Sequence, residues 1–82
     1  MGIFNTVKFK ILEKFILGLG YNKYSQEGSH IKYKYGNMSL TIPKHKEISR
    51  GTLNNIFKII SLHIGIDKNQ IENNFISYYN KF

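Results

Sequence analysis

The fold is decided by residues 28–43, G-S-H-I-K-Y-K-Y-G-N-M-S-L-T-I-P, which have the pattern of two β-strands joined by a tight turn. In the first strand apolar or aromatic residues alternate with cationic or titratable ones: Ile31, Tyr33 and Tyr35 with His30, Lys32 and Lys34. Because successive side chains of a strand point to opposite faces, one face of the sheet should be buried and the other should carry the charges. Gly36-Asn37 suits a hairpin turn with glycine first, and Pro43 ends the next strand because it has no N–H to donate.

The neighbouring sequence completes a three-stranded antiparallel sheet. Met38, Leu40 and Ile42 continue the apolar face on the strand that follows the turn. Residues 21–26 form a further short strand on the N-terminal side, and Gly28 turns the chain from it into the strand that begins at His30.

An amphipathic helix is predicted before the sheet, over about residues 6–18. Its apolar positions recur at helical spacing: Val7, Ile11, Phe15 and Leu19, with Leu12 and Ile16 beside them. Asn5 or Thr6 is expected to cap its start, and Gly18 or Gly20 to end it. The lysines of this helix are interpreted as a solvated face rather than as RNA contacts.

Two further helices are predicted after a polar connection at residues 44–48. The first is capped by Ser49 and ends at Gly65, with Leu53, Ile56, Phe57, Ile60 and Ile64 on its apolar face. In the second, over about residues 68–80, Asp67 and Gln70 resemble a capping box, and the apolar face holds Ile71, Phe75, Tyr78, Tyr79 and Phe82.

The sequence therefore predicts an α+β fold in the order helix, three strands, helix, helix. Since only one face of the sheet is apolar, both main helices should pack on that face. A chain of 82 residues has room for one domain, 1–82, with a core over residues 6–65 and an extra C-terminal helix.

Composition narrows the classes of partner. Twelve Lys+Arg against five Asp+Glu give a net charge of +7, which favours binding to a polyanion such as RNA or to an acidic protein. The chain has no cysteine, which is compatible with the cytoplasm. The most apolar run, residues 11–19, is far shorter than the roughly 20 residues of a membrane span, and it lacks the flanks of a signal peptide.

Several short motifs follow one another along the chain: G-Y at Tyr21, Q-x-G-S-H ending at His30, an aromatic residue at Tyr33, then L-T-I-P, P-K-H and G-T-L-x-x-I. In this order and spacing they resemble the motifs of HicA-type toxins, the small mRNA interferases of bacterial and archaeal toxin–antitoxin pairs. The resemblance covers about residues 11–65. The chain departs from the family pattern at Tyr21, where Trp is frequent, and at Ser25, where Arg is frequent.

The resemblance implies an α-β-β-β-α fold like that of double-stranded-RNA-binding domains. It also implies cleavage of mRNA, which stops translation, and inhibition by a HicB-type antitoxin. The catalytic histidine of the family motif falls on His30. The oligomeric state, the RNA sequence preference and the part played by the third helix stay open.

The residues themselves suggest how RNA would be cleaved. RNA carries its own nucleophile, the 2′-OH, so cleavage needs proton transfer and cations that stabilise the phosphorane. Histidine suits proton transfer near neutral pH, and His30 would act as general base or acid. The expected phosphate or RNA contacts are Ser29, Lys32, Lys34 and Lys44, and Gly28 shapes the turn. The five acids are scattered, so we expect a nuclease without metal or other cofactor.

Some assignments remain open at this point. His45, in the loop after Pro43, is the candidate second proton carrier, but it is equally well a simple loop residue. His63 is interpreted as a cation near the C-terminus of its helix. Tyr24 is the best candidate for stacking on a base. A noncatalytic RNA-binding module on the same fold is the alternative function, and a basic membrane-surface protein is a third hypothesis.

Overall fold

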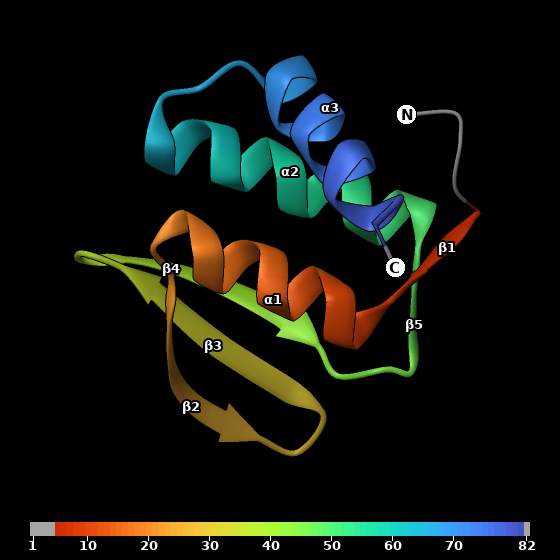
Figure 1. Ribbon diagram of the computed structural model, residues 1–82. Coiled ribbons are helices and arrows are strands. Elements are labelled where there is room, and N and C mark those ends of the chain that lie inside the picture. Colours follow the sequence, from red (N-terminus) through yellow and green to blue (C-terminus); the bar gives the residue numbers. More distant parts are fainter. Residues whose placement is uncertain (1–4, 82) are drawn as a thin grey trace.

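The computed structural model describes residues 5–81. Phe82, which the helical pattern placed on the third helix, lies outside the described residues. The elements follow in the order β1 (Thr6–Lys8), α1 (Phe9–Leu19), β2 (Asn22–Glu27), β3 (His30–Tyr35), β4 (Met38–Pro43), β5 (Glu47–Ser49), α2 (Arg50–Ile64) and α3 (Lys68–Tyr79) (Figure 1). The predicted α+β class and the order of the three main strands are confirmed.

The main sheet is antiparallel, with β3 between β2 and β4. Ile31 pairs with Ile42 and Tyr33 with Leu40, and these four side chains are fully buried or nearly so. The predicted faces are correct for these four residues, and the alternation of β3 points Lys32 to the other side. Met38, predicted on the apolar face, is 40 % exposed because it lies at the start of β4, next to the turn. The ladder between β2 and β3 is regular except for a β-bulge between Lys23 and Ser25.

A second, two-stranded sheet corrects the predicted N-terminal helix. Residues 6–8 form β1, which pairs antiparallel with β5, and α1 begins only at Phe9. Neither Asn5 nor Thr6 caps α1; its N-cap is Lys8, which makes no side-chain capping bond. The strand prevails over the helix because Val7 is buried opposite Ile48, and because Thr6 Oγ1 donates a hydrogen bond to Glu47 Oε1 at 2.7 Å.

The helices all lie on one side of the main sheet (Figure 1). α1 and α2 cover the apolar face, and α3 packs on them on the side away from the sheet. Phe75 of α3 is fully buried, with its ring centroid 5.1 Å from that of Phe15 and 5.3 Å from that of Phe57. The third helix, whose part was open, thus contributes to the same hydrophobic core as α1 and α2.

Apart from the start of α1, the helix ends follow the predicted signals with one exception, the capping box of α3. Gly20 ends α1 in the left-handed conformation, and the Ser49 side chain accepts a hydrogen bond from the Thr52 N–H at the start of α2. The predicted capping box is wrong: Asp67 occupies the N-cap of α3 without a side-chain bond. Gln70 does not complete the box either, and its amide Nε2 donates forward to Asn74 Oδ1 at 3.1 Å.

Candidate functional site

The outer face of the main sheet carries three of the predicted site residues. His30 opens β3, and the strand alternation places Lys32 and Lys34 on the same side, opposite the buried Ile31 and Tyr33. The imidazole of His30 is exposed, and its cross-strand neighbours are Glu27 on β2 and Pro43 on β4. The sheet therefore presents a histidine to solvent at one end of a row of cations.

The turn before His30 is held by backbone contacts. Gly28 has φ +61°, a conformation that costs glycine little, while a Cβ there would meet no atom within 4 Å. Gly28 is thus needed for its backbone conformation and not for space. The carbonyl of Ser29 accepts a hydrogen bond of 2.5 Å from the Lys44 N–H, which ties the turn to the loop after β4.

The two lysines of β3 have different surroundings. Lys32 is exposed, between Ser25 on β2 and Thr41 on β4. The Nζ of Lys34 lies 4.2 Å from the centroid of the Tyr24 ring, a cation–π contact. Tyr24 is 63 % exposed, so its ring stays accessible beside the cationic row.

His45 lies in the connection between β4 and β5, and its side chain is exposed. The structure shows no hydrogen bond between the imidazoles of His30 and His45, both of which it describes. The loop does bring Lys44, which directly precedes His45, against the turn that carries His30. The loop thus approaches the turn as expected, through a backbone hydrogen bond.

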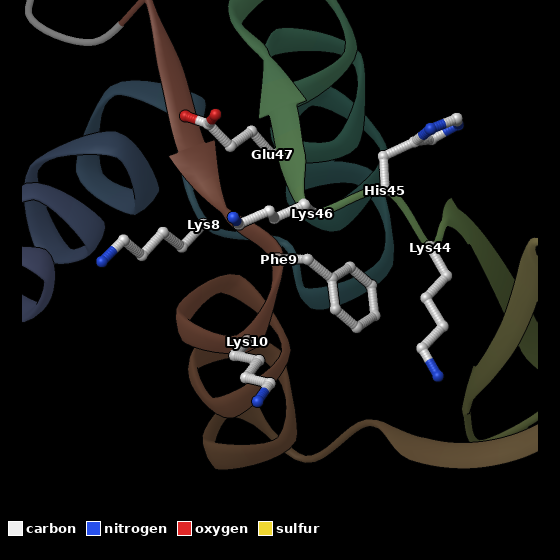
Figure 2. Close-up of a pocket in the computed structure, with 7 residues that line it drawn as sticks. All are labelled: Lys8, Phe9, Lys10, Lys44, His45, Lys46 and Glu47. Atoms are coloured by element: carbon white, nitrogen blue, oxygen red, sulfur yellow. The ribbon is translucent and has the colours of Figure 1, made fainter.

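A cavity of about 620 Å³ is lined by several lysines that no sequence pattern had grouped. It is lined by Lys8, Phe9, Lys10, Lys44, His45, Lys46 and Glu47, and we call it the basic cleft. Figure 2 shows the ring of Phe9 near the centre of the lining, with Lys10, Lys44 and Lys46 around it. The only sequence signals were the two K-x-K runs, K-F-K and K-H-K, which lie more than thirty residues apart.

Two buried tyrosines, Tyr21 and Tyr33, belong to the core and not to the outer sheet face. Tyr33 Oη donates a hydrogen bond of 2.5 Å to Glu13 Oε2. Burial, this hydrogen bond and the negative charge of Glu13 all raise the pKa of Tyr33. Burial, with a smaller effect of Tyr35, raises the pKa of Tyr21 to about 12.

His63 lies in the last turn of α2, as predicted, and it also contacts the core. Its Nδ1 is 2.8 Å from Tyr21 Oη, a hydrogen bond between α2 and the residue that follows α1. No local sequence pattern indicates this pair, because the two residues are separated by 42 positions. The contact explains His63 as a structural residue.

Residues 5–81 contain neither a cluster of metal ligands nor a helix that could span a membrane. No group of three or more His, Cys, Asp or Glu side chains is placed to hold a metal ion in that part of the chain. None of its helices combines the length and apolar character that crossing a bilayer requires. The polar groups on the outer face of β3 are the imidazole of His30 and the ammonium groups of Lys32 and Lys34.

Comparison with known protein families finds a match over most of the main fold. A family model described as HicA toxin of bacterial toxin–antitoxin matches residues 9–62, from the first residue of α1 almost to the end of α2. No curated protein and no solved structure matches the chain. The matched segment contains His30 and the whole main sheet, and it ends before α3.

Proposed function

Because the chain belongs to the HicA toxin family of bacterial toxin–antitoxin systems, we propose that it is an endoribonuclease that cleaves mRNA and thereby stops translation. The observation that carries the proposal is the position of His30: an exposed imidazole on the outer sheet face, at the end of a row with Lys32 and Lys34. An RNA strand lying on this face would meet a proton-transfer group and two cations together.

In the proposed reaction the 2′-OH of the substrate attacks the adjacent phosphorus. His30 removes the proton of the 2′-OH, the P–O5′ bond breaks, and a 2′,3′-cyclic phosphate and a free 5′-OH are formed. Lys32 and Lys34 stabilise the negative charge of the phosphorane, and Lys44 and the Ser29 hydroxyl hold neighbouring phosphate oxygens. No step needs a metal ion or another cofactor.

The departing 5′-oxygen needs a proton. His45 is our candidate donor, because its loop is joined to the His30 turn through the Lys44 N–H. If His30 works alone, it must return the proton that it took from the 2′-OH, and His45 is then dispensable. The two schemes differ in the effect of a His45 substitution on kcat.

Membership of a toxin–antitoxin family implies an antitoxin partner. We propose a HicB-type antitoxin that covers the outer sheet face and presents acidic groups to Lys32 and Lys34. Since the substrate is mRNA, the protein would act in the cytoplasm.

One observation favours the alternative of a noncatalytic RNA-binding module. Among residues 5–81, no side chain forms a hydrogen bond that would orient the imidazole of His30. Catalytic histidines are commonly oriented by a second group. In this alternative the outer face would bind RNA and leave it intact.

The test compares wild type with His30→Ala, purified identically, on mRNA in the presence of EDTA. We expect wild type to cleave and to arrest growth on expression, and His30→Ala to do neither while keeping its melting temperature. Equal cleavage by both proteins would reject His30 as the catalytic residue. RNA that is bound but left intact by wild type would support the noncatalytic alternative.

A further inference from the structure

We propose that the basic cleft binds the phosphodiester backbone of single-stranded RNA and anchors the substrate beside the His30 site. The proposal rests on the proposed function, since it assigns the cleft to the same RNA. It adds Lys8, Lys10 and Lys46 to the binding surface, three residues that lie outside the sheet face. The following observations support it.

The charge of the cleft is strongly unbalanced. Four lysines line it, together with one acid, Glu47, whose carboxylate already accepts a hydrogen bond from Thr6 at 2.7 Å. Within residues 5–81, none of these lysines forms an ion pair. Four lysines that line one cavity without ion pairs to the described residues favour a ligand with several negative charges along its length.

The start of α1 adds to the positive potential. Lys8 is the N-cap of the helix and Lys10 lies in its first turn, which holds no acidic residue. The N-terminal end of a helix already carries partial positive charge, so lysines there disfavour the helix unless an anion is bound. The sequence thus places cations where helix stability alone would favour acids.

The walls of the cleft are held in place by the small sheet. Lys8 pairs with Glu47 in the β1–β5 ladder, and the Phe9 N–H donates a hydrogen bond of 3.1 Å to the Lys46 carbonyl. The cations from the N-terminus and from the loop after β4 are therefore fixed relative to one another. Such a preformed site loses little conformational entropy of the backbone when a ligand binds.

The cleft continues into the proposed catalytic site. Pro43 is the cross-strand neighbour of His30, and Lys44, which follows it, lines the cleft and donates its N–H to the Ser29 carbonyl at 2.5 Å. An RNA strand bound at His30 can therefore follow Pro43 and Lys44 into the cleft. This continuity favours RNA as the ligand over an acidic segment of a protein.

The lining favours contact with phosphates and not with bases. Phe9 is the only aromatic hydrocarbon ring of the lining and is 6 % exposed, so it offers little surface for stacking. Lysine acts as a point charge on phosphate and carries no base preference by itself. The cleft should therefore raise the affinity for RNA without adding sequence specificity.

The test measures binding with cleavage removed. His30→Ala serves as the parent, and Lys10→Gln and Lys46→Gln are added together; the matched control adds Lys58→Gln, an exposed lysine of α2 outside the cleft. Binding of a fluorescent 12-nucleotide RNA is followed by anisotropy over a range of salt. Because each phosphate contact on single strands contributes about 0.7 to the salt slope, we expect the slope to fall by about 1.4 and the Kd at 0.1 M salt to rise roughly 25-fold.

Two further measurements separate the possible failures. Acetylation of the parent protein with and without RNA should show protection of Lys10 and Lys46 but not of Lys58, and this holds even if the double variant does not fold. A poly-glutamate peptide of equal charge should compete weakly; if the double variant loses the peptide but keeps RNA, the cleft binds acidic protein and the proposal is wrong. Unchanged slope and Kd relative to the Lys58→Gln control would also overturn it. These results do not depend on cleavage, so they stand apart from failure of the His30 assignment.

Discussion

The partly buried hydrogen bond between Tyr33 and Glu13 gives the most specific prediction for stability. Tyr33 is fully buried on the inner face of β3, and its Oη donates to Glu13 of α1 at 2.5 Å. Tyr33→Phe removes the hydroxyl donor and leaves the Glu13 carboxylate without this hydrogen bond. Since hydrogen bonds to charged groups contribute about 1.5–3 kcal/mol, we expect the free energy of unfolding to fall by about 2 kcal/mol at pH 7. In a domain of this size that lowers Tm by roughly 8–16 °C.

The effect should depend on pH in a defined direction. Burial raises the pKa of Tyr33 above its ordinary value of 10, so the folded protein keeps this proton while the unfolded chain loses it. Stability from Tyr33 is therefore fully present below pH 10 and is lost as the pH rises above that value. The difference between wild type and Tyr33→Phe should shrink at pH 11.

Urea denaturation followed by circular dichroism, at pH 7 and at pH 11, measures both quantities. Tyr24→Phe is the matched control, because Tyr24 is 63 % exposed and a phenyl ring keeps the cation–π contact with Lys34. In a Glu13→Gln background the Tyr33→Phe effect should fall below about 1 kcal/mol, since the charged acceptor is gone. A Tyr33→Phe effect at pH 7 no larger than that of the control, or one that grows with pH, would refute the reasoning.

Three other predictions concern the site and the helix caps. His45→Ala should lower kcat by about 10²-fold or more if His45 protonates the leaving oxygen, and an unchanged kcat in single-turnover cleavage would assign both transfers to one histidine. Replacing Lys32 and Lys34 by Glu should weaken binding of the antitoxin by at least tenfold in a titration at low salt, and an unchanged Kd would place the antitoxin on another surface. Ser49→Ala should cost about 1 kcal/mol in a urea melt because it removes the cap of α2, whereas Asp67→Ala should cost less than about 0.5 kcal/mol; equal costs would contradict the observed difference between the two caps.

Local patterns were enough to predict the sheet and its exposed face. The alternation of Ile31 and Tyr33 with His30 and Lys32 has one consistent solution, because a register slip of one residue would bury the charges. Glycine turns and a serine cap then placed the ends of β3 and α2. The position of His30 on the outer face follows from this pattern alone, whereas the proposal that His30 is catalytic rests on the family resemblance.

The parts that were missed depend on contacts between distant segments. β1 and β5 are three residues each, too short for a periodic signal, and their pairing partners Thr6 and Ser49 are 43 positions apart in the chain. The same holds for the Tyr21–His63 hydrogen bond. The apolar spacing of Val7 also fits a helix, so the predicted helix begins too early. The strand depends on the pairing of Val7 with Ile48, a contact that no local pattern indicates.

The small β1–β5 sheet changes where the charge of the molecule lies. If residues 6–8 were part of a helix, Lys8 and Lys10 would belong to its solvated face. In the structure residues 6–8 form β1, and Lys8, Lys10 and Lys46 line the basic cleft. The cations thus gather at two places, the outer face of β3 and the cleft, and Lys44 connects them. If only the first place holds the reacting phosphate, substitutions at the second should raise KM and leave kcat unchanged, because they remove binding that the substrate and the transition state share. Affinity for RNA and the rate of its cleavage would then be separable by mutation in this toxin, and an antitoxin that covered either place would inhibit it.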